Sequence, residues 1–362
     1  MSHLLSDAGL PELIAAIMVL ALNAYVLTGG ADFGGGVWDL LAGGPRRDAQ
    51  RALIARAIAP IWEANHVWLI LVVVMLFTAF PAAFATLGTV LHIPLSLMLA
   101  GIVLRGTSFI FRSYGARDSA SQYRWGRVFS VASLVTPMLL GAIVGAIASG
   151  AVGEAAALLP SSARAEGVMP RFATVFVAPW LSPFPLAMGV LALAMFAFLA
   201  AVYLALAARD DALREDFRRR ALGAALLVFV AAFGGLGAAK LRAPHIMYGL
   251  TSGAALLFQA ATAIAALSAI SALWWRHWRV ARVAAALQVS LILWGWVLVQ
   301  YPFVIPPSQT VRSVAAPHVT LVLLLYALIG GSVVLFPSLA YLYRTFAAVE
   351  THSGSIKRDP TG

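Results

Sequence analysis

Three polar side chains stand close together in a mostly apolar stretch of the chain, residues 59–68. They are the carboxylate of Glu63, the amide of Asn65 and the imidazole of His66. Such groups are costly inside a lipid bilayer, so those found there usually face the protein interior and mark an ion path, a proton relay or a cofactor. On a helix, Glu63 and His66 would share one face, and Trp62 would pair with Asn65 on the neighbouring face. This segment is therefore the first candidate for chemistry.

Two further charges are expected close to this segment. Asp32 follows the first long apolar run, and Arg105 lies within a later one. At 1.5 Å per helical residue, Arg105 would lie roughly 6 Å in depth from Glu63, so the three charges would form a ladder leading inward from one membrane surface. A buried carboxylate in such a ladder could relay protons. An ion pair between Glu63 and Arg105 that only joins two helices is an equally good interpretation.

Two histidines, His66 and His92, could suggest a b-type haem, because neutral imidazoles on facing helices are common haem ligands. Their expected depths differ, however, at roughly 21 Å and roughly 12 Å from the outer ends of their helices. Two axial ligands should lie near one level, so a hydrogen-bonded core histidine is the better interpretation of His66.

The glycine-rich stretch 29–36 could be mistaken for a phosphate-binding loop. It follows an apolar run that predicts a helix rather than a strand, and it lacks the Lys-Ser/Thr pair of such loops. Its glycines instead predict a tight helix exit and close packing.

The elements that position these residues must be membrane helices. The 362-residue chain is 61% hydrophobic and 11% charged, with a mean hydropathy of +0.88, which is far from the composition of a soluble domain. It contains no cysteine, which excludes disulfides, thiolate metal sites, iron–sulfur clusters and c-type haem attachment. The net charge of +10 comes from arginines in short loops, so it reflects membrane topology and not nucleic-acid binding.

Apolar runs long enough to cross a bilayer predict an all-α integral membrane protein with nine transmembrane helices. The expected spans are 11–30, 53–80, 84–111, 126–150, 183–208, 219–239, 250–275, 282–305 and 318–343.

Arginines cluster after the first, third, fifth and seventh spans, so the positive-inside rule places the N-terminus outside and the C-terminus in the cytoplasm. The expected units are a first four-helix bundle over 1–150, an outer linker over 151–182 and a second four-helix bundle over 183–305. A ninth, peripheral helix and a cytoplasmic tail would occupy 306–362.

Four motifs resemble subunit II of bd-type quinol oxidases, the cytochrome bd and cyanide-insensitive oxidase group. They are YVLTGGADFG at 25–34, PIWEANHVWL at 60–69, RGTSFIFR at 105–112 and the proline-rich turn at 301–308. Ala31 stands where many relatives have an aromatic residue, Glu63 where many have Asp, and His66 is not the commonest residue at its position.

This resemblance implies a haem-free subunit in the bacterial inner membrane, inactive alone and paired with a subunit I that carries haems b and d. The complex would reduce oxygen to water with electrons from a quinol such as ubiquinol, and a small third subunit and a structural quinone belong to the same expectation. Glu63 would relay protons, Asp32 would be the acid on the cytoplasmic side, and Arg105 would tune Glu63. Trp62, Asn65 and His66 would support them.

Two other functions fit the same residues. A proton-coupled secondary transporter could use Glu63 as its coupling acid, although Pro94 and Pro137 have no matching helix breaks in the second half of the chain. A pure scaffold would only stabilise a partner subunit.

Overall fold

The computed structural model describes residues 9–58, 62–114, 119–159, 171–251, 253 and 255–355. The side chains of 62–63, 113–114, 119–120, 343 and 346–355 are not described. The elements are α1 (Leu10–Leu40), α2 (Arg47–Ile58), α3 (Trp62–Ala79), α4 (Pro81–Val90), α5 (His92–Tyr114), α6 (Ser119–Ala148), α7 (Ala151–Ala157), α9 (Phe172–Phe176), α10 (Pro183–Ala207), α11 (Asp211–Arg242), α12 (Pro244–Leu250), α13 (Ala255–Trp274), α14 (Trp278–Gln300), β1 (Phe303–Ile305), β2 (Gln309–Thr310) and α15 (His318–Ser355).

The protein is an all-helical, multi-pass membrane protein. Within the described residues, α1, α5, α6, α10, α11, α13, α14 and α15 are each long and apolar enough to cross a bilayer. A ninth crossing exists if α3 and α4 count as one bent span. Eight candidate spans thus confirm the fold class, and the ninth span stays a prediction.

The first membrane helix is longer than the sequence predicts. Its span was expected over 11–30 with a helix exit at Asp32, whereas α1 continues to Leu40 and buries Asp32 in its interior. The predicted helix exit was wrong because the helix propensity that a glycine loses is small compared with the stabilisation that close packing of the helix provides. The additional turns carry the acidic residues of α1 deep into the helix bundle.

Close packing explains why the glycines of α1 remain helical. A Cβ atom at Gly34 would overlap the carbonyl oxygen of Phe196 in α10, and one at Gly36 would overlap the hydroxyl of Ser133 in α6. The absence of these side chains lets α1 lie directly against both helices, as in other membrane helix pairs. The prediction of close packing is confirmed.

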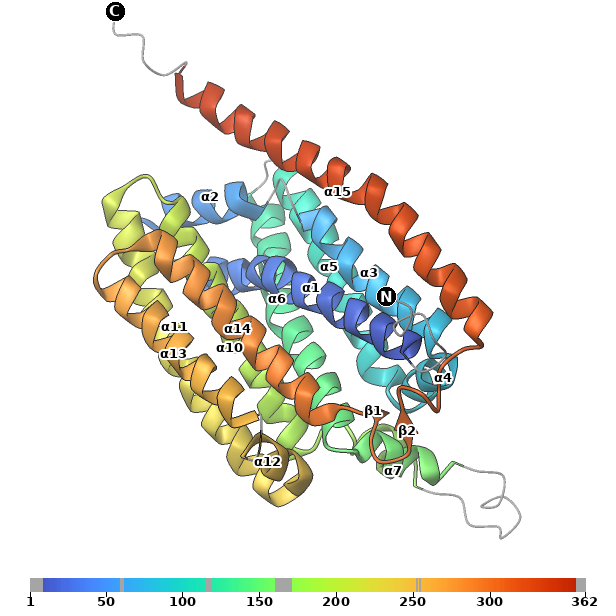
Figure 1. Cartoon of the computed structure of the whole chain (residues 1–362). Coiled ribbons are helices and arrows are strands. Elements are labelled where there is room, and N and C mark those ends of the chain that lie inside the picture. Colours follow the sequence, from blue (N-terminus) through green and yellow to red (C-terminus); the bar gives the residue numbers. More distant parts are fainter. Residues whose placement is uncertain are drawn as a thin grey trace, which may run out of the picture.

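The span expected at 53–80 includes parts of α2 and α3, whose axes run in different directions (Figure 1), and residues 59–61 between them lie outside the described residues. Within the described residues, α2 ends at Ile58 and α3 begins at Trp62. The short α2 is amphipathic, with Leu53 buried and Arg56 exposed, and it lies across the end of the helix bundle (Figure 1). The hydropathy of α3 extends into α2, which made the two helices look like one span.

The span expected at 84–111 is also divided. Its first residues belong to α4, which ends at Val90, and α5 begins at His92. The axis of α4, which begins at Pro81, is bent by 116° from that of α3, which ends at Ala79, so this bend falls between the expected spans 53–80 and 84–111. Proline is well suited to the first turn of a helix and cannot continue the preceding one. Residues 84–111 are apolar enough for a membrane throughout, so hydropathy alone does not reveal the division between α4 and α5 at Leu91.

The most buried helix is α10, which packs against α1, α6, α11 and α14. It therefore contacts helices from both of the predicted four-helix bundles, and their separation into 1–150 and 183–305 stays a prediction. The last helix, α15, runs along the outside of the molecule next to α3 and α1 (Figure 1). The segment 151–182, expected as a linker, contains α7 and α9.

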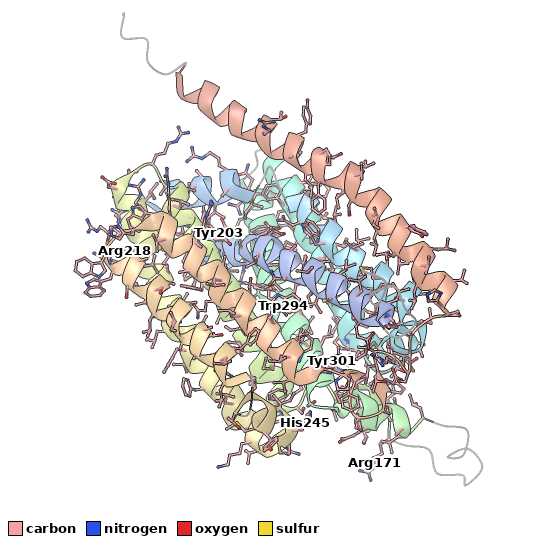
Figure 2. All side chains as sticks on the ribbon, in the orientation of Figure 1. Arg171, Tyr203, Arg218, His245, Trp294 and Tyr301 are labelled. Carbon is pink, nitrogen blue, oxygen red and sulfur yellow. The ribbon has the colours of Figure 1, made fainter. Side chains whose placement is uncertain are left out.

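The two ends of the bundle differ in charge. At one end, here called the basic end, Arg46 forms an ion pair with Asp216 and Arg218 forms one with Glu215. The hydrogen bonds from Arg46 to Asp216 raise the pKa of the Arg46 guanidinium above its ordinary value. The other end, here called the hairpin end, carries α7, α12 and the antiparallel β1–β2 pair. Figure 2 shows Arg218 at the basic end and His245 at the hairpin end.

Candidate functional site

The centre of the site is an ion pair between α1 and α5. The guanidinium of Arg105 binds both carboxylate oxygens of Asp32, with Nη1–Oδ2 and Nη2–Oδ1 distances of 2.9 Å and 2.6 Å. Both side chains are 2% exposed. A bidentate pair of this kind is the strongest form of charge-assisted hydrogen bond, and both charges are almost completely removed from solvent.

The remaining contacts of Arg105 leave little of its guanidinium unbonded. Its Nη2 also donates to the backbone oxygen of Asp32 at 3.1 Å, and its Nε donates to the hydroxyl of Ser133 at 3.1 Å. The rings of Phe33 and Phe129 lie 4.7 Å and 5.1 Å from its Cζ atom. Helices α1, α5 and α6 thus enclose one ion pair between two aromatic rings, which is favourable for a desolvated cation.

A second ion pair repeats the first at the basic end. Asp39, seven residues after Asp32, binds Arg112, seven residues after Arg105, through distances of 2.8 Å and 2.9 Å. Asp39 is 2% exposed, whereas Arg112 is 25% exposed and Arg51 approaches the same carboxylate at 3.8 Å. Seven residues are about 10 Å along a helix, so the two pairs lie on one line toward the basic end.

Asp39 was not predicted as a site residue. Because the first helix was expected to end at residue 30, Asp39 was expected in a loop. The signal that could have found it is the spacing, because Asp32 and Asp39 on one helix match Arg105 and Arg112 on another. A spacing of seven returns side chains to nearly the same face of a helix.

Phe129 of α6 separates the two ion pairs. Its ring lies 5.1 Å from the Cζ atom of Arg105 and 5.9 Å from that of Arg112. The ring is 2% exposed. Phe129 is therefore an apolar partition between the buried pair and the pair at the basic end.

The segment that opened the sequence analysis forms the first turns of α3. Trp62 and Glu63 belong to this helix, but their side chains lie outside the described part of the chain. Residues 59–61 lie outside the described part of the chain, so the expected depth of Glu63, roughly 15 Å along a helix from residue 53, stays a prediction. Asn65 is 1% exposed, and neither atom of its amide has a hydrogen-bond partner among the described residues.

His66 faces α1 and packs near the ion pair. Its ring lies 6.2 Å from the ring of Tyr25 and 6.4 Å from that of Phe33. Its Nδ1 atom is buried and has no hydrogen-bond partner among the described residues. His92 lies elsewhere, at the start of α5, where its ring meets that of Phe176 at 5.2 Å and its Nδ1 lies 2.9 Å from the backbone oxygen of Thr89.

The structure therefore brings together three of the predicted residues. Asp32 and Arg105 are in direct contact, and His66 reaches the same cluster through the ring of Phe33. The described guanidinium contacts of Arg105 go to Asp32 and Ser133, so the expected influence of Arg105 on Glu63 stays a prediction. Within the described residues, no three His, Asp or Glu side chains gather as a metal-ligand set.

Comparisons with known proteins place the chain in one family. A family model described as cytochrome bd terminal oxidase subunit II matches residues 10–346. The chain is 30% identical over 137 residues to cytochrome bd ubiquinol oxidase subunit 2 of Bacillus subtilis (strain 168), which covers 38% of this chain and 39% of that protein. It is 30% identical over 129 residues to cytochrome bd-I ubiquinol oxidase subunit 2 of Escherichia coli (strain K12), which covers 36% and 33%. These alignments span less than half the length of either relative.

A solved structure has a similar fold. A chain in the structure of bd oxidase from Geobacillus thermodenitrificans superposes with a TM-score of 0.75 at 20% sequence identity. The match covers 93% of this chain and 98% of that chain. The likeness therefore concerns the fold of nearly the whole protein.

Proposed function

Because the chain belongs to the cytochrome bd terminal oxidase subunit II family, we propose that it is the haem-free subunit of a bd-type quinol:oxygen oxidoreductase. Its partner would be subunit I, which carries haems b and d and performs the oxidation of quinol and the reduction of oxygen to water. The chain alone is not expected to be active. The names of two relatives include ubiquinol oxidase, which supports a quinol as the electron donor.

The proposed setting is the bacterial inner membrane, with nine spans, the N-terminus outside and the basic end in the cytoplasm. The arginines at the basic end support this orientation through the positive-inside rule. A small third subunit and a structural quinone also belong to the proposed complex.

Within this complex, we propose that the chain supplies part of the cytoplasmic proton path. The observation that carries this role is the buried Asp32–Arg105 pair, whose side chains are 2% exposed, together with His66, whose ring packs against Phe33 next to this pair. The Nδ1 atom of His66 and the amide of Asn65, its neighbour in sequence, are buried and have no hydrogen-bond partner among the described residues. Buried polar groups are normally hydrogen-bonded, so these atoms are available to water or to a neighbouring carboxyl. A line of such groups is what a proton needs to cross an apolar interior.

The proposed roles differ between the two acids. Arg105 occupies both carboxylate oxygens of Asp32, so Asp32 would supply fixed charge on the cytoplasmic side of the path. Glu63, in the first turn of α3, would be the group that accepts and releases protons. Asn65 and His66, two and three residues further along α3, would hold the hydrogen-bonded chain next to it.

The test is Glu63→Gln in the complete complex with subunit I, because the amide keeps the size of the side chain and cannot carry a proton. We expect oxygen consumption and proton uptake to fall about tenfold or more, with the haem spectrum and subunit content unchanged, since positioned proton-transfer groups contribute factors of this size or larger. Glu154→Gln, an exposed acid on α7, is the matched control and should retain full activity.

Unchanged turnover in Glu63→Gln would reduce Glu63 to a structural residue and remove the proton path from the proposal. Loss of the complex itself would favour the scaffold interpretation. Proton-coupled solute uptake by vesicles that contain this chain alone would favour the transporter.

A further inference from the structure

An elongated cavity lies in the second half of the chain, away from the ion pairs. Helices α10 and α11 pack tightly on one another, as do α13 and α14, and the cavity occupies the space between these two pairs. Its volume is about 370 Å³, within the range of small-molecule sites. Small residues create this space where larger side chains would fill it, among them Ala232, Gly235 and Ala239 on α11 and Gly295 on α14.

The cavity is open toward the lipid between α11 and α13. Phe229 and Phe233 of α11 line it and are about 60% exposed, and Gln259 and Ala263 of α13 line it from the other side and are also exposed. An apolar molecule can therefore enter sideways from the bilayer without crossing water.

The length of the cavity fits a lipid chain. Its lining on α11 extends from Ala225 to Ala239, which corresponds to about 21 Å along the helix. One leaflet of the hydrocarbon core is about 15 Å deep, or half of the bilayer core. A molecule held along this wall would reach from the hairpin end past the middle of the membrane.

The end of the cavity nearest the hairpin end contains one polar group, and two cations stand beyond it on the same helix. The indole N–H of Trp296 is buried there and has no hydrogen-bond partner among the described residues. Trp296 packs in the same cluster as Ala239, so both lie at one level. Lys240 and Arg242 follow on the last turn of α11 and are exposed.

These two cations continue the wall of the cavity. Lys240 stands four residues after Leu236 and Arg242 stands three after Ala239, so each follows a lining residue on its own side of α11, one on either side of the cavity wall. The site thus has cations at the membrane surface, a hydrogen-bond donor just below them and an apolar slot beneath. This is the order of groups in a glycerophospholipid, whose phosphate, ester carbonyls and acyl chains occupy the same three levels.

We propose that this cavity binds one anionic glycerophospholipid, with an acyl chain between α11 and α13. The phosphate would lie at Lys240 and Arg242, and an ester carbonyl would accept the hydrogen bond of Trp296. The charges favour this occupant over a quinone, which is neutral and has no group for two cations. Gln288 lines the deep end of the cavity, and its amide could hydrogen-bond the carbonyl of a quinone ring. The experiments must therefore distinguish a lipid from a quinone.

The first experiment measures lipid retained by the complete complex with subunit I, purified in mild detergent and washed extensively. Gly235→Leu should empty the cavity, because a Cβ there meets only the sulfur of Met188, at 3.7 Å, and the remaining atoms extend into the space. Gly237→Leu is the matched control on the same helix, since it is exposed and its Cβ has no neighbour within 4 Å among the described residues. Mass spectrometry should find about one phosphatidylglycerol per complex in the parent and in Gly237→Leu, and less than a tenth of that in Gly235→Leu.

The second experiment adds phosphatidylglycerol or phosphatidylethanolamine of equal chain length to the delipidated parent complex and to variants. Replacing both Lys240 and Arg242 with Gln should weaken phosphatidylglycerol binding about thirtyfold, because each cation near an anionic lipid contributes about one kilocalorie per mole. Phosphatidylethanolamine has the same phosphate, but its ammonium group neutralises the head group, so its binding should weaken much less. Trp296→Phe should weaken both lipids about fivefold, the effect of one hydrogen bond. Arg171→Gln, an exposed cation at the hairpin end that does not line the cavity, should change neither (Figure 2).

Three results would overturn the proposal. A quinone recovered at one per complex and lost in Gly235→Leu would make the cavity a quinone site. Equal lipid retention by both glycine variants would mean that the lipid lies elsewhere. Equal affinity of the parent complex for the two lipids would remove the role of the cations. Each readout is binding and not turnover, so it stands independently of the proton path.

Discussion

The buried Asp32–Arg105 pair predicts a strong and specific energetic coupling. Replacing Arg105 with Met leaves the Asp32 carboxylate buried without its bidentate partner, and replacing Asp32 with Leu leaves the guanidinium without its anion. Because both side chains are 2% exposed, neither charge can be hydrated in place. Each single replacement should lower the free energy of unfolding by about 3–5 kcal/mol.

The double replacement should be much milder than either single one. With both charges absent no ion is left buried, and two apolar side chains can pack against Phe33 and Phe129, so the double variant should lose less than about 2 kcal/mol. Ser133 loses the donor Nε of Arg105 but keeps its own hydrogen bond to the backbone oxygen of Phe129 at 2.7 Å. The coupling energy of the cycle should therefore exceed about 3 kcal/mol.

The assay is denaturant unfolding of the complete complex in mixed micelles, followed by the fluorescence of the chain and the haem absorbance of its partner. A matched cycle on Arg214 and Asp211, an ion pair in which Asp211 is 94% exposed, should give a coupling below about 0.5 kcal/mol. If the effects of the two single replacements at Asp32 and Arg105 add up to the effect of the double replacement within about 0.5 kcal/mol, the two charges are not coupled and the reasoning fails.

Two further predictions follow from the same helices. Gly34→Ala should lower the free energy of unfolding by more than about 2 kcal/mol, because its Cβ would overlap the backbone oxygen of Phe196. The control is Gly88→Ala, whose Cβ would have no neighbour within 4 Å among the described residues, and which should be neutral or slightly stabilising in the same unfolding assay. Asp39→Asn should lower the free energy of unfolding by only about 1–2 kcal/mol, because Arg112 is 25% exposed and water can solvate it. A loss as large as that of Asp32→Leu, measured in parallel, would contradict this difference in burial.

The sequence predicted the membrane fold and part of the site for identifiable reasons. Ionisable residues in apolar runs are rare, which singled out Asp32, Glu63 and Arg105, and two of these three are in direct contact in the structure. The contact itself was not predicted, because depth estimates along helices give a level in the membrane and not a direction around the helix axis. Glu63 was therefore paired with Arg105 on depth alone.

The errors in the helix boundaries have a common cause. Hydropathy reports how apolar a segment is and not whether its axis is continuous, so the division of the expected span 84–111 into α4 and α5 at Leu91 was invisible to it. At the glycines around Gly34 the error was the opposite: a helix end was expected where the helix continues. Glycine is a poor helix former in isolation, but here its missing side chain lets another helix pack closely, and that packing stabilises the helix. Tertiary contacts decided both cases.

The equal spacing of the two ion pairs also determines how α1 and α5 must be aligned along the membrane normal. With acids at Asp32 and Asp39 and cations at Arg105 and Arg112, a single vertical alignment satisfies all four groups. A slip of one turn in either direction would leave all four charges without their partners, and a slip of two turns would still orphan one acid and one cation. The two ion pairs therefore fix the position of α1 relative to α5 during assembly. In a bilayer, apolar side chains alone would let two helices slide past each other at little cost in free energy.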